Sequence, residues 1–237
     1  MASLPSNISL RHLGRIIRGA VAFAHPDPTP DPNNTNPNSP HTPANPNQPT
    51  PPPDFESDSL ALFRLLHNRN IPHLLVGGIA LLRYVRGRNT DDIDLILNAA
   101  DLPRLPEFAI TDRNNDFAAA RFRSLRVDLC LTTNPVFALA LNHHATAHNF
   151  AELAVPCATP AGLILLKLYA LPSLYRQHDL ARAALYENDI LMLMQAEHAD
   201  PDPLLAALRP TLAPADITEL QAIIAEIRTR LARMRRE

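Results

Sequence analysis

Apolar positions recur with two different periods between residues 57 and 236, and each period predicts a different kind of element. Spacings of three and four residues predict helices, whereas short apolar runs and strict alternation predict strands. Ser57 or Asp58 can cap the first helix, and Pro172 is expected to end the helix that begins at Pro160. The expected strands are 71–76, 92–97, 117–122, 125–131 and an extended piece ending at 155–156, and the expected helices are 60–66, 79–85, 137–144, 160–171, 188–199, 203–208 and 214–236.

The order of these elements predicts an α+β fold. Strands and helices mix in the first half of the chain, and helices dominate the second half. We therefore expect a core with a small mixed β-sheet over residues 57–150 and a helical region over residues 151–237. No internal repeat is apparent.

Residues 1–56 differ from the rest in composition. Residues 1–24 carry three arginines, no acidic residue and several apolar positions, which is typical of an amphipathic helix. This helix resembles an organelle transit peptide, or it is a frayed terminal segment. Residues 25–54 hold 12 of the 24 prolines and have no aromatic residue. Such a segment cannot bury enough apolar surface to fold, so we interpret it as an extended linker.

The overall composition argues against several classes of protein. The formal net charge of the 237 residues is −2, which is no signature of nucleic-acid or membrane binding. The two cysteines cannot form a disulfide framework, and no apolar run reaches the length of a membrane helix. We therefore expect a cytoplasmic protein with no membrane partner. Of the 22 basic residues, only Lys167 is a lysine.

A glycine pair, Gly77-Gly78, lies between an expected strand and an expected helix. Glycines at such a place allow backbone N–H groups to approach an anion closely, so the pair is a candidate phosphate-binding loop. The flanking residues match neither the dinucleotide-binding GxGxxG pattern nor the P-loop. A tight turn without a ligand is the alternative interpretation.

Three aspartates are the candidate catalytic residues. Asp92 and Asp94 are two apart on one expected strand, so both carboxylates point to one face, and alternation around Asp128 places its carboxylate away from the core. If the two strands are neighbours, the three carboxylates converge. Two unit charges about 4 Å apart repel by roughly 4 kcal/mol at an effective dielectric of 20, which favours cation binding, and Mg²⁺ prefers oxygen ligands. Ion pairs with Arg88 or Arg126 are the alternative.

This pattern resembles the nucleotidyltransferase superfamily with a DNA polymerase β-type core. The matching residues are Gly77, Gly78, Asp92, Asp94 and Asp128. The resemblance implies that the glycines contact nucleotide phosphates, that the three aspartates hold two Mg²⁺ ions, and that a nucleoside triphosphate such as ATP is the substrate.

The later helix resembles the abortive-infection toxin-like branch of that superfamily. Lys167, followed by Arg176, Asp179 and Asp189-Ile190, carries this resemblance. It implies that Lys167 contacts the nucleotide and that the Asp-Ile segment packs beside the site. Lys167 could instead extend along the helix surface to solvent, and Asp189 could simply begin a helix.

Four other features have two interpretations each. Arg83, Arg86 and Arg88 either bind the triphosphate or lie in a solvated loop. His144 and His148 could share a helix face as zinc ligands do, although a solvated polar helix explains them as well. Cys130 either lines the cleft or is a small buried residue. The last helix has apolar residues at heptad-like spacing, which suits packing on its own chain or a homodimer, and its arginines could contact nucleic acid. The heptad-like positions are Ile217, Leu220, Ile224, Ile227, Leu231 and Met234.

Together these observations predict a Mg²⁺-dependent nucleotidyltransferase. Asp92, Asp94 and Asp128 are the expected metal ligands and catalytic residues, while Gly77, Gly78, Arg88 and Lys167 are expected to bind the nucleotide. The acceptor hydroxyl is open: transfer RNA, protein and a small molecule all suit the same chemistry. The toxin-like resemblance implies a possible antitoxin partner. The alternatives are an inactive nucleotide-binding or partner-binding module of the same fold, and a nucleic-acid-binding protein that uses its arginine-rich helices.

Overall fold

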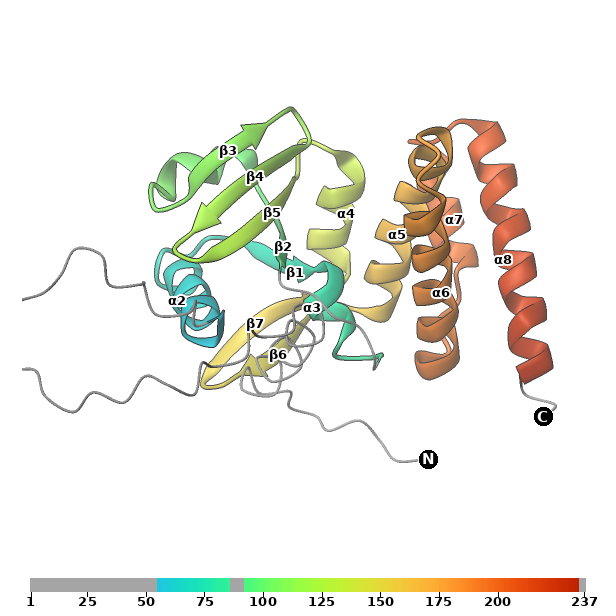
Figure 1. The fold of residues 1–237 in the computed structure, drawn as a ribbon, viewed down its shortest axis with the longest axis horizontal. Coiled ribbons are helices and arrows are strands. Elements are labelled where there is room, and N and C mark those ends of the chain that lie inside the picture. Colours follow the sequence, from blue (N-terminus) through green and yellow to red (C-terminus); the bar gives the residue numbers. More distant parts are fainter. Residues whose placement is uncertain (1–54, 86–91, 235–237) are drawn as a thin grey trace, which may run out of the picture.

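A seven-stranded mixed sheet forms the centre of the protein, with the strand order β3-β4-β5-β2-β1-β7-β6 (Figure 1). The structure is a computed structural model and describes residues 55–85 and 92–234. Strand β1 runs antiparallel to β2 and parallel to β7, and β2 runs parallel to β5. The strands are β1 (His73–Val76), β2 (Asp92–Leu97), β3 (Ala109–Arg113), β4 (Phe117–Phe122), β5 (Leu125–Leu131), β6 (Ala145–Phe150) and β7 (Leu153–Ala158).

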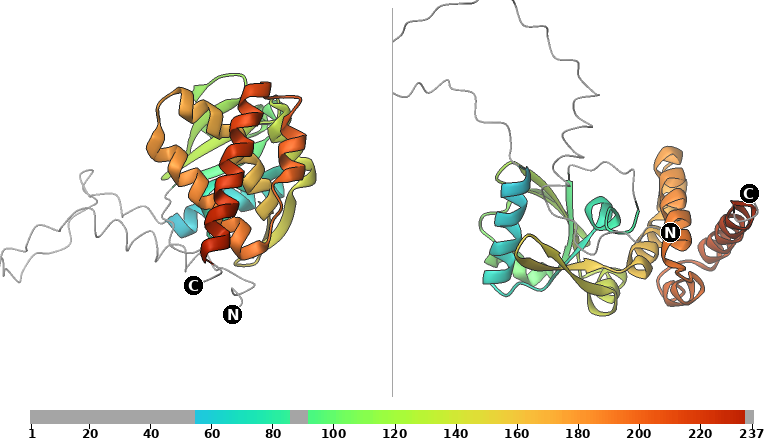
Figure 2. Two further views of the ribbon diagram at one scale, coloured as in Figure 1. Left: turned by 90° about the vertical axis from the view of Figure 1, so that its right-hand side faces the viewer. Right: turned by 90° about the horizontal axis from the view of Figure 1, so that it is seen from below.

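Helices cover both faces of the sheet. Helix α2 lies on one face, whereas α3 and the C-terminal helices lie on the other (Figure 2). The expected α+β fold, with a mixed sheet followed by a helical C-terminal part, is confirmed. The helices are α2 (Phe55–Asn68), α3 (Gly77–Leu81), the 3₁₀ helix η1 (Ala99–Arg104), α4 (Pro135–His143), α5 (Pro160–Arg176), α6 (Leu180–Glu197), α7 (Asp202–Leu208) and α8 (Pro214–Met234).

Alternation on the central strands produces the core and leaves polar residues on the opposite face. Ile93 and Leu95 of β2 are fully buried, and Leu62 of α2 is buried as well. The positions that alternate with these buried residues include Asp92 and Asp94 on β2 and Asp128 on β5, and these three side chains are only half-buried. Because successive side chains of a strand point to opposite faces, the sheet separates its apolar core from the acidic residues.

Helix α5 extends beyond its expected end. It continues through Pro172 to Arg176, so the expectation that Pro172 stops it is wrong. A proline inside a helix costs about 3 kcal/mol, but Leu168, Leu171 and Leu174 around it are all buried. Burial of each such side chain contributes about 1.5–3 kcal/mol, which outweighs the lost hydrogen bond.

Other boundaries also differ from the expectation. Helix α6 begins at Leu180 rather than at 188, because the Asp179 side chain accepts a hydrogen bond from the backbone N–H of Arg182 and so caps the helix. Helix α3 begins at the glycines and ends at Leu81. Strands β3 and β6 were not expected: both lie at edges of the sheet, and every residue of β3 is exposed, so the apolar signal that marks a strand is missing.

The expectation that His144 and His148 share a helix face is wrong. His144 caps the end of α4, and His148 lies in β6. The Arg83 side chain donates a hydrogen bond to His148 Nδ1 over 3.1 Å. His148 therefore helps to join the turn after α3 to the edge strand.

The apolar face of α8 packs on its own chain. Ile217, Leu220, Ile224, Ile227 and Leu231 are buried in the structure, against α5, α6 and α7. Strand β7, which follows residue 150, belongs to the central sheet. Among residues 55–85 and 92–234, no helix has both the length and the apolar character to cross a membrane. The expected N-terminal helix, the linker, Arg86 and Arg88 lie outside the described residues.

Candidate active site

The three aspartates meet on one face of the sheet. Strands β2 and β5 are adjacent and parallel, and their register places Asp94 directly beside Asp128 and Asp92 beside Arg126. Since Asp92 and Asp94 are two residues apart, all three carboxylates point away from the core. The convergence expected from alternation is therefore present in the structure.

The glycine pair lies against Asp94. Gly77 has a φ of +64°, and a Cβ atom at this position would lie 1.9 Å from Asp94 Oδ2. The backbone N–H of Gly78 donates a hydrogen bond to the Asp94 carboxylate. Only glycine allows both the left-handed backbone conformation and this close approach. The pair thus has a structural role, to hold Asp94, in addition to any contact with a ligand.

The electrostatics of Asp94 show that the acidic residues are close together. Burial, followed by the negative charges of Asp128 and Asp92, raises the pKa of Asp94 from its ordinary 3.8 to about 6. The Gly78 hydrogen bond and the charge of Lys167 act in the opposite direction. A strongly perturbed carboxyl group in a cleft is typical of a functional site.

Arg126 forms ion pairs with the other two aspartates. Its guanidinium lies 3.8 Å from Asp92 Oδ2 and 3.2 Å from Asp128 Oδ2. The expected alternative of an ion pair with Arg126 is therefore observed for these two residues. The arginine side chain is 62% exposed, and such solvent-exposed pairs stabilise a fold by about 0–1 kcal/mol, so Arg126 can move aside at little cost.

Lys167 is held inside the protein and does not extend to solvent. Its Nζ lies 2.8 Å from Asp189 Oδ2 and 4.3 Å from the centre of the Tyr186 ring. Asp189 is buried in the interior of α6, so the interpretation that it begins a helix is wrong. A buried lysine with one carboxylate and one aromatic face around it has a defined position.

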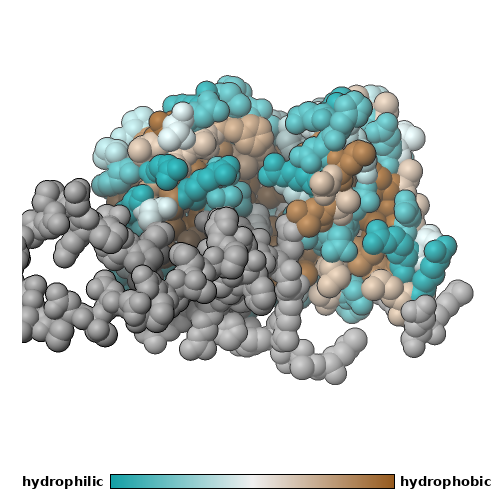
Figure 3. All heavy atoms as spheres, in the orientation of Figure 1, coloured by the Kyte–Doolittle hydropathy of each residue, from teal (hydrophilic) through white to brown (hydrophobic). Residues whose placement is uncertain are grey.

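A cavity of about 610 Å³ connects these groups with the C-terminal helices. It opens between the sheet and the helices, where apolar side chains are visible in the recess (Figure 3). Gly77, Asp94 and Lys167 line one part of it. Other lining residues come from β4, β5, α4, α5, α6 and α8, and include Phe117, Cys130, Phe137, Tyr169, Arg176, Arg182, Tyr186 and Asp216. This volume is typical of a small-ligand site.

Cys130 lines this cavity on the same face as Asp128. Burial and the neighbouring charges of Asp94 and Asp128 raise the pKa of the thiol to about 12. The thiol therefore stays protonated at neutral pH and is not a nucleophile.

Sequence reasoning missed the aromatic side chains of the site. Tyr186, Tyr169, Phe137 and Phe117 are far apart in the chain, and each follows a helical or strand pattern typical of a core residue. Only the packing of α4, α5 and α6 against the sheet brings them to one cavity.

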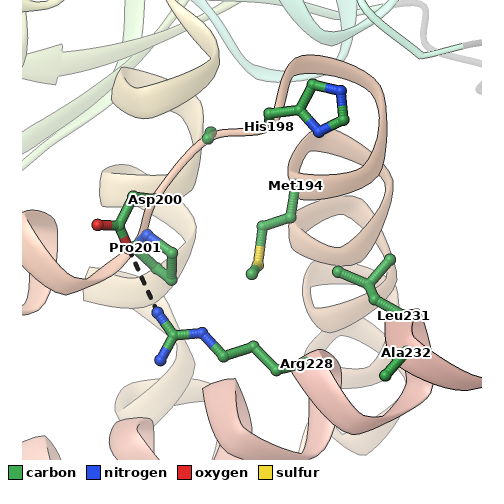
Figure 4. A pocket seen from close by; sticks show the side chains of 8 residues that line it. Met194, His198, Asp200, Pro201, Arg228, Leu231 and Ala232 are labelled. Carbon is green, nitrogen blue, oxygen red and sulfur yellow. Dashed lines mark hydrogen bonds and ion pairs between the residues drawn. The ribbon is translucent and has the colours of Figure 1, made fainter.

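A second cavity, of about 370 Å³, lies between the end of α6 and α8 (Figure 4). Its polar side chains are His198, Asp200 and Arg228, and Arg228 forms ion pairs with Asp200 and Asp202 over 3.3 and 2.9 Å. None of its lining residues belongs to the acidic site. The second cavity is therefore separate from the cavity that contains the acidic residues.

The donor set of the acidic site suits Mg²⁺ in one specific way. Over the described part of the chain, no three His, Cys, Asp or Glu side chains are arranged to hold one metal ion. Mg²⁺, however, takes one or two protein carboxylates and completes its shell with water and substrate phosphates. Asp94 and Asp128, side by side and mutually repelling, provide such a pair. The residues therefore fit an ion that arrives together with a phosphate ligand.

The fold is similar to that of a nucleotidyltransferase-like protein. No protein-family model and no curated protein matches the chain. The crystal structure of an antigenic nucleotidyltransferase-like protein from Paracoccidioides brasiliensis has a TM-score of 0.53 and 18% identity, and the match covers 75% of this chain and 89% of the other. This similarity confirms the expected nucleotidyltransferase type of fold.

Two structures of ANT(2")-Ia are more distantly similar. The complex with adenylyl-2"-tobramycin has a TM-score of 0.46 and 15% identity, with coverage of 73% of this chain and 98% of that one. The solution structure of this antibiotic-resistance factor has a TM-score of 0.46 and 14% identity, with coverage of 77% and 98%. Membership of the toxin-like branch stays a prediction.

Proposed function

We propose that this protein is a Mg²⁺-dependent nucleotidyltransferase that moves a nucleotidyl group from a nucleoside triphosphate to an acceptor hydroxyl. The observation that supports this most strongly is the convergence of three carboxylates beside a glycine pair. Burial, together with the repulsion from the other two carboxylates, raises the pKa of Asp94 to about 6. A fold similar to that of a nucleotidyltransferase-like protein is consistent with the proposal.

Each residue has a proposed role. Asp92, Asp94 and Asp128 would hold two Mg²⁺ ions between them, with no ion bound by all three. The metal, when bound, would neutralise phosphate oxygens and support in-line displacement. Gly77 and Gly78, at the start of α3, would lie beside the leaving phosphates. Asp128 accepts the proton of the acceptor hydroxyl, whose oxygen bonds to the α-phosphorus while the bond to pyrophosphate breaks.

Lys167 has a proposed electrostatic role in the same site. It is buried beside Asp189 and its charge acts on Asp94, so it favours the ionised carboxylates and the negatively charged triphosphate. Arg88, the other proposed nucleotide-binding residue, lies outside the described residues. The Lys167 assignment follows the resemblance, the Arg88 assignment follows the match of arginine to phosphate oxygens, and both remain predictions.

A transfer assay tests the proposal. Each α-³²P-labelled nucleoside triphosphate is incubated with total tRNA, with protein and with small alcohols, with Mg²⁺ or with EDTA. Wild-type protein is expected to label one acceptor pool only with Mg²⁺, and Asp94→Asn is expected to label none. Asp112→Asn, on the exposed strand β3, is the matched control. Equal labelling by wild type and Asp94→Asn contradicts the proposed catalytic role.

One observation favours a second function, that of an inactive nucleotide-binding module. Arg126 neutralises two of the three aspartates in the structure and so provides a counter-ion without a metal. Under this alternative, nucleotide binds to wild type and no acceptor pool is labelled. Arg126→Gln separates the two functions, because it removes the guanidinium beside Asp92 and Asp128. If the protein is an enzyme, this variant is expected to bind Mg²⁺ more strongly than wild type.

A further inference from the structure

Three aromatic side chains form one continuous wall of the large cavity. The ring centres of Phe117 and Phe137 lie 5.2 Å apart, and those of Phe137 and Tyr169 lie 5.9 Å apart, in both cases edge to face. All three rings line the cavity. We refer to Phe117, Phe137 and Tyr169 as the aromatic wall.

The aromatic wall is fixed from behind by a buried hydrogen-bond network. Asn134 Nδ2 donates a hydrogen bond to the Tyr169 hydroxyl over 2.8 Å, and Asn134 Oδ1 accepts one from the backbone N–H of Val136 at the start of α4. Asn134 is 4% exposed and Phe137 is 4% exposed. The orientations of Tyr169 and Phe137 are therefore set before any ligand binds, which lowers the entropic cost of binding.

The front of the wall is exposed to solvent. Phe117 is 46% exposed and is one of five large apolar side chains exposed in the described part of the chain. It is the only one of those five that lines this cavity. An exposed aromatic face in a preformed concave site is typical of a surface that a ligand covers.

The strand order places the wall on one particular side of the acidic residues. Along the sheet, Gly77 follows β1, Asp94 lies on β2, Asp128 on β5 and Phe117 on β4. Phe117 pairs with Cys130 and so shares the face of Asp128. Strands are about 4.8 Å apart, so Phe117 lies roughly 10 Å from β2, on the side away from the glycines.

This position is the acceptor side of the proposed reaction. In an in-line displacement the attacking and leaving oxygens lie on opposite sides of the phosphorus atom. If the leaving phosphates lie at Gly77, the acceptor approaches past Asp128, where the aromatic wall stands. We propose, on the basis of the proposed function, that the aromatic wall binds a planar ring carried by the acceptor, next to its reactive hydroxyl.

The charges around the cavity restrict the acceptor further. The lining contains three cations, Lys167, Arg176 and Arg182, and two carboxylates, Asp94 and Asp216. Arg176 and Asp216 pair over 2.8 Å, and Asp94 belongs to the proposed Mg²⁺ site. Cations therefore outnumber carboxylates among the lining residues, which disfavours a polycation. The acceptor class is therefore a neutral or anionic hydroxyl compound with a planar ring, such as a nucleoside or a nucleotide end.

A tryptophan placed in the wall tests this proposal without any turnover. The chain has no tryptophan and four tyrosines, so Phe117→Trp introduces a single tryptophan at the front of the wall, whose emission can be excited selectively over that of the tyrosines. Ile110→Trp is the matched control, because Ile110 is 42% exposed on β3 and does not line the cavity. Each full-length variant is titrated with adenosine, which has a ring and hydroxyls, with ribose, which has hydroxyls only, and with the polycation tobramycin.

The expected result is saturable quenching of Phe117→Trp by adenosine, at a concentration at least tenfold below any effect of ribose or tobramycin, with no change in Ile110→Trp. Saturating α,β-methylene-ATP with Mg²⁺ is expected to change the adenosine concentration at half-saturation by less than about twofold. Three results overturn the proposal: no saturable quenching, stronger quenching by tobramycin, or quenching by the ATP analogue that prevents the adenosine response. The last result would assign the wall to the base of the nucleotide.

The transfer assay distinguishes a failure of this inference from a failure of the proposed function. If wild type transfers nucleotide but adenosine does not quench Phe117→Trp, the proposed role of the aromatic wall is refuted and the proposed enzymatic activity is retained. If adenosine quenches Phe117→Trp but the protein labels no acceptor, the proposed function fails, and the acceptor role of the aromatic wall fails with it. Only the conclusion that the wall binds a planar ring is then retained. Thermal unfolding of Phe117→Trp within a few degrees of wild type shows that the variant is folded.

Discussion

Replacing Asp94 with Asn is expected to stabilise the folded protein while it removes the proposed activity. Asp94 is surrounded by Asp128, Asp92 and apolar residues, and its pKa is raised from 3.8 to about 6. Each pKa unit corresponds to about 1.36 kcal/mol, so the ionised carboxylate is less stable in the folded state by about 3 kcal/mol. Asn has almost the same shape and can still accept the hydrogen bond from Gly78, but it carries no charge.

The sign of the pH dependence follows from the raised pKa. A carboxyl group whose folded pKa is above its unfolded value adds stability that is fully present below pH 3.8 and is lost as pH rises through about 6. The advantage of Asp94→Asn is therefore expected to be about 1.5 kcal/mol at pH 5 and about 3 kcal/mol at pH 8. Below pH 4 it is expected to vanish.

Unfolding in guanidinium chloride at pH 5 and pH 8, with EDTA present, measures these differences. Asp112→Asn, on an exposed strand, is the control and is expected to change stability by less than about 0.5 kcal/mol. Addition of Mg²⁺ is expected to stabilise wild type and not Asp94→Asn. The electrostatic reasoning is refuted if Asp94→Asn is less stable than wild type at pH 8, or if the stability difference between the two proteins is the same at pH 5 and pH 8.

Three further variants probe the packing around the site. Lys167→Met removes the cation that lies 2.8 Å from the buried Asp189 carboxylate and is expected to destabilise the fold by about 3–5 kcal/mol. The double variant with Asp189→Leu is expected to recover most of this loss in chemical denaturation, and additive losses would contradict the pairing. Gly77→Ala places a Cβ atom on Asp94 Oδ2 in a left-handed backbone, so a melting temperature lower by several degrees and loss of nucleotide transfer are expected, whereas unchanged values exclude the contact. Burial lowers the pKa of His73 below 6.5, so its contribution to stability is complete above pH 6.5 and is lost as pH falls. Wild type is therefore expected to lose stability relative to His73→Leu between pH 7 and pH 5, by up to about 1.36 kcal/mol per pH unit, and a parallel pH dependence would show that His73 titrates normally.

Alternation and spacing were enough to predict the acidic part of the site. A strand with carboxylates at every second position and apolar residues between them has only one way to bury its apolar side. Asp92 and Asp94 therefore had to share a face, and Asp128 had to point away from the core of its own strand. The glycine pair was equally visible, since it follows directly on a buried strand.

The environment of Lys167 was not predictable from the same pattern. The helix around it is apolar on several sides, so its period does not show which face meets α6. Its partner Asp189 is 22 residues away, in a helix whose start depends on the Asp179 cap. Which charge compensates a buried lysine is decided by how two helices pack.

The sequence by itself determined which residues face the core and which face solvent along β2, β4 and β5, because side-chain direction in a strand depends only on position. Tertiary structure alone decided which strands are neighbours, that Arg126 pairs with two of the acidic residues, and that Phe117, Phe137 and Tyr169 form one wall. These contacts join segments that no local period connects. They form because the sheet and the helices bury their apolar surfaces against one another in one shared core, which brings distant segments together.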